Sequence, residues 1–382
     1  MSNLKIDIIV AVWGDNFIGP FLTVALPSML SPGNMPVLAL KSRIRLQIFT
    51  SASGAAYMKS TAVIQKARQY STVNFYTVGS TEEMSKSSTY HLHTVILQNA
   101  IGIAEKEHAD FVIFAPDFIV SDGTMPSMRD ALHERCGCVM IPSIRTSKFP
   151  LLSEMLRIHG WEIAHTQSLT ISSRELAAFA LRHLHPLLHS AIVTRDADGQ
   201  THCRPPLFYW KVDEVGLVVR SMVWSPIYVR PRHWPKALTP TIDFQDFSAA
   251  CGIRQDEIVP ATDSDENLIV EFSSFTADFY QVDRAHATID CVIDWIGRLG
   301  MPHHLENLKY SYVMHTTDLA QTSAAHVQQD ASETAIKILE ATVPLVEFKL
   351  APRLWNDVRT AKALLPKGTS ALNDDSRTSG HS

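Results

Sequence analysis

The chain has 382 residues, of which 46% are hydrophobic and 19% are charged, and its formal net charge is -5. This apolar fraction is typical of a packed globular protein and excludes a largely disordered chain. The weakly acidic balance argues against a nucleic-acid-binding protein, which would need a basic surface for phosphates. The 5 cysteines are odd in number and scattered, which argues against a disulfide framework. Composition therefore leaves a globular enzyme or an assembly protein.

The sequence carries no recognisable targeting or membrane-spanning segment. The apolar stretch 6–12 is too short for the core of a signal peptide, and Asp7 interrupts it. No window approaches the roughly 18 to 20 apolar residues that cross a bilayer. We therefore expect a cytoplasmic protein.

The first 145 residues alternate short apolar strands with longer helical stretches. The β-branched run 6–12 is typical of a strand buried on both faces. An apolar stripe predicts a helix over 88–107, and further strands are expected at 44–49, 73–78, 111–114 and 138–141. This alternation favours an α/β fold with a mostly parallel sheet flanked by helices. In such sheets ligands bind at the carboxyl ends of the strands.

After residue 150 the predicted elements are less regular. Ser172 and Glu175 form a capping box that predicts a helix through His189. Strands are expected at 216–220 and 226–229, a proline-rich loop at 230–240, and helices at 277–300, 318–329, 331–342 and 353–365. We therefore expect an α/β unit over 1–270, a helical appendage over 271–367 and a disordered tail over 368–382.

Two candidate ligand sites follow strands of the expected sheet. After the first strand, Gly14 permits a tight turn, Asp15 can accept hydrogen bonds and Trp13 can stack on a base. After the fourth strand come Asp117 and Asp122, which a parallel sheet would place in the ligand crevice. The alternative is that these aspartates cap a helix or form turns, since Asp122-Gly123 is a common turn pair.

Three further segments, together with Trp13-Gly14-Asp15, match the sequence pattern of one protein family: Leu26 to Leu30, Pro32-Gly33-Asn34 and Leu46 to Thr50. Over residues 5–145 they resemble the nucleotide-binding half of GT-A-type glycosyltransferases, and 111–123 resembles the metal-binding Asp-x-Asp motif of that family. The pattern is incomplete, because Ala115 stands two residues before Asp117 where the family has a carboxylate. The resemblance implies a GT-A-like (Rossmann-like) fold and a nucleotide-sugar donor. It also implies transfer to a glycan, lipid-linked or protein acceptor in bacterial surface-glycan or glycoconjugate synthesis.

The resemblance assigns roles to residues at these strand ends. Trp13, Gly14, Asp15 and Thr50 would line the nucleotide pocket. Asp117 would face the diphosphate and a Mn2+ or Mg2+ ion, with Asp122 or the downstream His233 as further metal ligands. The alternative is a metal-independent enzyme in which cationic side chains neutralise the leaving group, with these candidates: Arg145, Lys211 and Arg220.

An inverting transferase also needs a general base within reach of the acceptor hydroxyl. Asp213, Glu214 and Asp243 are the candidates in the second half of the chain. The alternatives are a solvated turn for Asp213 and Glu214 and a helix cap for Asp243. Asp263-x-Asp265-x-Asn267 resembles the start of a calcium loop, but Leu268 occupies the glycine position of that motif, so we reject it.

The segment 348–367 combines basic residues with an apolar stripe. Such a helix lies either on an anionic membrane surface or, more commonly, against its own domain or a partner, including a second copy of the chain. Two other functions stay open beside glycosyl transfer. One is a sugar nucleotidyltransferase, although a Gly-rich phosphate loop is missing after the first strand. The other is a non-catalytic scaffold that binds a nucleotide or glycan.

Overall fold

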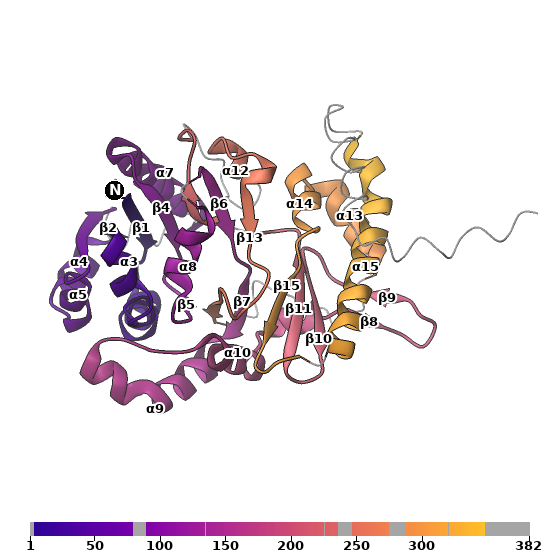
Figure 1. Ribbon diagram of the computed structural model, residues 1–382, viewed down its shortest axis with the longest axis horizontal. Coiled ribbons are helices and arrows are strands. Elements are labelled where there is room, and N and C mark those ends of the chain that lie inside the picture. Colours follow the sequence, from indigo (N-terminus) through magenta and orange to yellow (C-terminus); the bar gives the residue numbers. More distant parts are fainter. Residues whose placement is uncertain are drawn as a thin grey trace, which may run out of the picture.

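The computed structural model describes residues 4–78, 89–133, 135–224, 226–235, 247–274, 288–319 and 321–347. Within these ranges, one large sheet and two three-stranded sheets carry helices on their faces (Figure 1). None of the described helices combines the length and the apolar character needed to cross a bilayer. The expected helix 353–365 and the tail 368–382 lie outside the described residues.

The large sheet has seven strands in the order β13-β6-β12-β4-β1-β2-β3. Its strands are β1 (Leu4–Ala11), β2 (Ser42–Thr50), β3 (Ser71–Thr77), β4 (Asp110–Phe114), β6 (Gly137–Met140), β12 (Pro226–Arg230) and β13 (Ile258–Pro260). Only β12 among them runs antiparallel to its neighbours, β4 and β6. The mostly parallel α/β architecture expected from the sequence is therefore confirmed, and β1 is a buried interior strand between β4 and β2.

The helices of the first half connect these strands and cover the sheet. They are α1 (Asp15–Pro20), a π-helical turn (Phe21–Ala25), α2 (Leu26–Met29), α3 (Met35–Lys41), α4 (Ala52–Lys59), α5 (Ala62–Ala67), α7 (Thr89–Glu107) and α8 (Thr124–Ala131). α7, the helix expected at 88–107, packs on β1 and β4, whereas α3 packs on β2. Because β1 and β4 are parallel neighbours, the loops that follow them lie together at one edge of the sheet.

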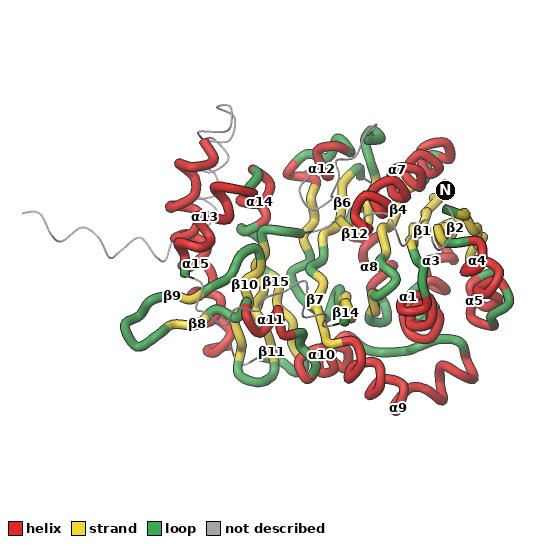
Figure 2. The backbone as a smooth tube through the Cα atoms, turned by 180° about the vertical axis from the view of Figure 1, so that it is seen from behind, coloured by secondary structure: helices red, strands yellow, loops and turns green. Residues whose placement is uncertain are grey.

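A small sheet continues from that edge. It contains β5 (Phe118–Val120), β14 (Ile269–Ser273) and β7 (Ser143–Ser147), in the order β5-β14-β7. Below it lie α9 (Lys148–Thr166), α10 (Ser173–Arg182) and α11 (Pro186–Ser190), with α9 along the lower edge of the molecule (Figure 2). The domain boundary expected after residue 270 falls inside β14. This strand pairs with β5 and β7, which belong to the first expected unit.

Ser172 is confirmed as the N-cap of α10, because its side chain accepts a hydrogen bond from the Glu175 backbone N–H, but the Glu175 carboxylate lies 3.1 Å from the His159 ring and does not complete the capping box. The expected single helix through His189 is wrong. α10 ends at Arg182, Leu184 makes a β-bridge with Thr146, and α11 begins at Pro186. Proline lacks the N–H that a continuous helix would use at that position.

The second half builds its own small core. β10 (Leu207–Val212), β11 (Gly216–Ser221) and β15 (Tyr312–His315) form an antiparallel sheet, against which lie α13 (Ile289–Leu299), α14 (Pro302–Asn307) and α15 (Gln321–Glu347). β15 is a strand inside the segment expected to be helical. The helices expected at 318–329 and 331–342 are one helix, α15, whose Asp330 accepts a hydrogen bond from Trp210. The remaining elements are β8 (Thr194–Arg195), β9 (Thr201–His202), α12 (Phe247–Ala250) and a 3-10 turn (Gln255–Glu257).

A buried ion pair joins the neighbouring strands β1 and β2. Asp7 has no solvent exposure, and Arg45 faces it in the strand register. Arg45 donates hydrogen bonds of 2.6 Å to both carboxylate oxygens, and Gln47 donates a third. Burial raises the pKa of Asp7, while the Arg45 guanidinium opposes that rise. The carboxylate therefore depends on Arg45 for compensation of its lost hydration.

We expect Arg45→Met to lower the free energy of unfolding by about 3–5 kcal/mol, because it leaves a buried carboxylate without its cation. Chemical denaturation measures the change. The double variant Asp7→Asn/Arg45→Met should recover much of the loss, and Arg43→Met, at an exposed position of the same strand, is the matched control. A loss of less than 1 kcal/mol in Arg45→Met (about the scale of a surface pair) would contradict this account.

Candidate functional site

The carboxyl edge of the large sheet is shaped by two loops. After β1, Gly14 adopts φ +76, a conformation that favours glycine, and α1 begins at the next residue. After β4, the turn Ala115-Pro116-Asp117 leads directly into β5. The Asp117 carbonyl accepts a hydrogen bond from the Phe272 N–H at 3.0 Å, which fixes the turn to β14.

Asp117 is partly buried and surrounded by charge. Burial, together with the negative charge of Glu271, raises the pKa of the Asp117 carboxyl to about 7, whereas Arg145 and Lys148 act in the opposite direction. Lys148, the first residue of α9, donates a hydrogen bond to the Asn16 carbonyl in the first turn of α1, which follows the loop after β1. The loops after β1 and β4 and the start of α9 therefore meet around one carboxyl group.

Glu271 and Arg145 face each other on β14 and β7. The Arg145 Nε lies 2.8 Å from a Glu271 oxygen, and the Ser143 hydroxyl donates to the other oxygen at 3.2 Å. Arg145 was predicted from the sequence, whereas Glu271 and Lys148 were not, because neither of them belongs to a motif. Strand pairing across 126 positions brings Glu271 to Arg145, and the sequence carries no local signal of that pairing.

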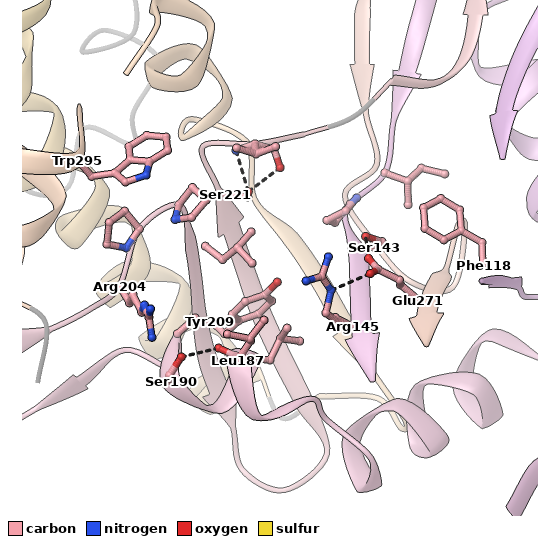
Figure 3. A pocket seen from close by; sticks show the side chains of 18 of the residues that line it. Phe118, Ser143, Arg145, Leu187, Ser190, Arg204, Tyr209, Ser221, Glu271 and Trp295 are labelled. Atoms are coloured by element: carbon pink, nitrogen blue, oxygen red, sulfur yellow. Dashed lines mark hydrogen bonds and ion pairs between the residues drawn. The ribbon is translucent and has the colours of Figure 1, made fainter. Parts of the chain in front are cut away.

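A cavity of ≈ 540 Å³ opens beside this pair (Figure 3). It lies between the small sheet, α11 and the β10–β11 hairpin, and its volume is in the usual range of small-molecule sites. Its lining includes Phe118, Ser143, Arg145, Leu187, Ser190, Arg204, Tyr209, Ser221, Glu271 and Trp295. Arg145 and Glu271 belong both to this lining and to the charged cluster around Asp117, so the cluster and the cavity are contiguous.

The residues expected to bind the nucleotide differ in whether a ligand can reach them. Gly14 lies on the loop after β1, the exposed Asp15 begins α1, and Trp13 packs partly buried against the core. Thr50 is fully buried, its carbonyl accepts from the Val78 N–H, and its hydroxyl lies under Gly54. Thr50 is therefore closed off from any ligand, and we correct its assignment to the nucleotide pocket.

The expected metal ligands do not come together. Asp122 lies at the other end of β5 from Asp117, where it accepts hydrogen bonds from the Ser31 hydroxyl and, at 2.7 Å, from the Gly33 N–H. His233 follows β12, which runs antiparallel, so it lies at the opposite edge of the large sheet and packs against Gly252. Of the three, only Asp117 lies at the carboxyl edge, and we correct the joint assignment of Asp122 and His233 to its metal site.

The expected bases also lie away from the cavity. Asp213 and Glu214 form the exposed turn between β10 and β11, at the far end of the hairpin from the lining residues Leu207 and Ser221. We therefore correct their assignment as bases, and Asp243 lies outside the described residues. The cations Lys211 and Arg220 are committed elsewhere: Lys211 lies 3.8 Å from Glu214, and the buried Arg220 donates to the carbonyls of Leu308 and Lys309.

Asp263, Asp265 and His315 form a separate cluster of side chains. The His315 Nε2 lies 3.0 Å from an Asp263 oxygen, and Arg174 forms a 2.8 Å ion pair with Asp265. The group lies on the loop before β14 and at the end of β15. Its carboxylates already have cationic or hydrogen-bonding partners, so it serves to fix α10 and β15 to this loop.

Comparison with known proteins adds little. No protein-family model and no curated protein matches the chain. Among solved structures it is similar to a protein described as a glucose-1-phosphate thymidylyltransferase from Bacillus anthracis, solved in complex with a sucrose. The two share 15% sequence identity over 38% of this chain, with a TM-score of 0.21. The likeness spans 57% of that chain.

The raised pKa of Asp117 predicts a pH-dependent stability. Between its ordinary value of 3.8 and about 7, the folded chain holds a proton that the unfolded chain has released. The free energy of unfolding therefore contains a contribution that falls as the pH rises through this window. Asn cannot titrate, so Asp117→Asn should gain stability relative to the natural chain from pH 4 to 7 and then level off.

We expect a gain of roughly 1–3 kcal/mol, since each pKa unit corresponds to about 1.4 kcal/mol and partial exposure screens part of it. Urea titrations at several pH values measure it. Asp198→Asn, at an exposed turn, is the matched control for the loss of a carboxyl group. A stability difference that is constant with pH would show that the Asp117 carboxyl titrates normally.

Proposed function

We propose that this protein is a glycosyltransferase that moves a sugar from a nucleotide-sugar donor to a hydroxyl of a glycan or glycoconjugate acceptor. The observation that carries the proposal is the partly buried Asp117 carboxyl at the end of β4, beside a cavity large enough for a second substrate. In open α/β sheets, ligands bind at this edge. The family resemblance of residues 5–145 supplies the donor class.

The donor is proposed to lie across the loops after β1 and β4. Gly14 leaves its backbone open to close approach, because a Cβ built there would meet no atom within 4 Å. Asp15 is exposed for hydrogen bonds to a ribose or base. The Lys148 ammonium, which acts electrostatically on Asp117, adds positive charge near the diphosphate. The nucleotide would thus contact α1 and α9 from one side.

Asp117 suits a divalent cation such as Mn2+ or Mg2+. Its ionised form is disfavoured by burial and by Glu271, and a bound cation would offset both effects. Carboxylate oxygens are preferred ligands of these ions, and the diphosphate would supply others. When bound, the cation would neutralise negative charge that develops on the leaving diphosphate.

Glu271 is the proposed general base. Its carboxylate lines the cavity, and the Arg145 Nε lies 2.8 Å from one of its oxygens, which fixes the position of the group. In a direct displacement, the acceptor hydroxyl gives its proton to Glu271 and the oxygen attacks the anomeric carbon. The bond from that carbon to the diphosphate breaks, and the diphosphate leaves with the electron pair. Arg145 then holds the neutral acid in place.

We expect a nucleoside diphosphate with Mn2+ to raise the Tm of the natural chain, because ligands that bind only the folded state stabilise it. Asp117→Asn should lose most of this shift, whereas the exposed Asp198→Asn should keep it. Thermal-shift measurements with uridine, guanosine and thymidine diphosphates, with and without Mn2+, test the donor site. Shifts that are equal in the natural chain and Asp117→Asn would contradict the role of Asp117.

We expect Glu271→Gln to lower kcat by roughly 10²- to 10⁴-fold, the usual contribution of a general base, while the Kd of the nucleotide changes little. Release of the nucleoside diphosphate from a nucleotide sugar measures turnover. Binding without sugar release in the natural chain would favour the scaffold instead. Turnover of a nucleoside triphosphate with a sugar 1-phosphate would favour a nucleotidyltransferase.

A further inference from the structure

The polar side chains that line the cavity differ in whether they already have partners. Ser190 donates to the Leu187 carbonyl and Ser221 to the Val223 carbonyl, both at 2.7 Å. Glu271 accepts from Ser143 and pairs with Arg145. The acceptors and hydroxyls on this side of the cavity are therefore largely satisfied within the protein.

Arg204 differs from these residues. Its Nη1 is shielded from solvent and has no hydrogen-bond partner in the part of the chain that the structure describes. A guanidinium is always charged, and a shielded charged donor without an acceptor is costly. A ligand oxygen in the cavity would supply the missing acceptor.

Two neighbours add to this donor character. The Tyr209 hydroxyl and the Trp295 indole N–H also line the cavity, and neither donates to another side chain or a carbonyl within the described residues. Burial raises the pKa of Tyr209, so its hydroxyl stays protonated and able to donate. The open hydrogen-bonding capacity of the cavity therefore consists mainly of donors, which favours a ligand that brings acceptors.

The rest of the wall is apolar. Its members include Phe118 of β5, Leu187 and Leu188 of α11, Pro205 and Pro206 before β10, and Ile227 of β12. A fully polar ligand would lose hydration against such a wall without gaining hydrogen bonds. A ligand with an apolar body gains from burial there.

We propose that this cavity binds an amphiphilic anion, with its apolar body against α11 and Pro205-Pro206 and its carboxylate, sulfonate or phosphate head on Arg204. The binding rests on the cavity itself. That such a ligand is the acceptor, or the carrier of the acceptor hydroxyl, rests on the proposed function, since Glu271 lines the same cavity.

Two fluorescent probes of similar shape separate the head from the body. 8-Anilinonaphthalene-1-sulfonate carries an anionic head, and N-phenyl-1-naphthylamine has the same aromatic body without charge. We expect Arg204→Met to weaken binding of the sulfonate at least tenfold, which corresponds to about 1.4 kcal/mol, and to change binding of the neutral probe less than twofold. Trp295→Ala should weaken both probes.

Arg157→Met, at an exposed position of α9, is the matched control and should leave both affinities unchanged. Arg204→Lys keeps the charge without the planar fork and should be intermediate, which tests the role of Arg204 even if the methionine variant folds poorly. Octyl phosphate should displace the sulfonate probe far better than inorganic phosphate does. Equal displacement by the two would indicate a plain anion site and overturn the proposal.

Unchanged binding of the sulfonate in both Arg204 variants would also overturn the proposal.

A different measurement tests the proposed transferase function, so the two proposals can fail independently. Nucleoside diphosphate with Mn2+ should stabilise Arg204→Met as well as the natural chain, because Arg204 lies on the side of the cavity away from Asp117. If no nucleotide stabilises the natural chain while the probes still discriminate at Arg204, the transferase proposal falls and the amphiphile site stands.

Discussion

The hydrogen bond from the Phe272 N–H to the Asp117 carbonyl joins the large sheet to the small one. β4 ends at the carboxyl edge of the large sheet, and this hydrogen bond fixes the turn that leads from β4 into β5. The same joint carries Asp117 on one side and Glu271, the neighbour of Phe272, on the other. Because β14 also pairs with β7, Arg145 comes to the same place. The charged cluster and the cavity wall thus follow from one junction between two sheets.

This junction separates two environments that a transferase needs. On the side of β1 and α9, the exposed loop with Gly14 and Asp15 is polar and open. On the side of α11 and the β10–β11 hairpin, the cavity is mostly apolar and carries Arg204. Glu271 lies between them and is held by Arg145. In the account proposed here, the donor occupies the first environment and the acceptor the second.

The sequence predicted the parts of this arrangement that depend on local patterns. Continuous β-branched runs such as 6–12 identify buried parallel strands, and the position of Asp117 after β4 follows from strand order alone. Its partners could not be predicted, because Glu271 and Arg145 meet only through the register of β14 with β7. His233 was misplaced for a related reason, since no local signal shows that β12 runs antiparallel. Asp122 was misread because its hydrogen bonds to Ser31 and Gly33 come from a distant loop.

The central claim is that Asp117 holds a cation together with a nucleoside diphosphate at the carboxyl edge. A crystal structure of the chain with uridine or guanosine diphosphate and Mn2+, with data collected for anomalous scattering by manganese, tests it most directly. The account predicts a manganese peak about 2 Å from an Asp117 carboxylate oxygen, a typical distance for an oxygen ligand of such ions, with the diphosphate beside Lys148. A peak at Asp263 and His315 instead, with a diphosphate away from β4, would contradict it.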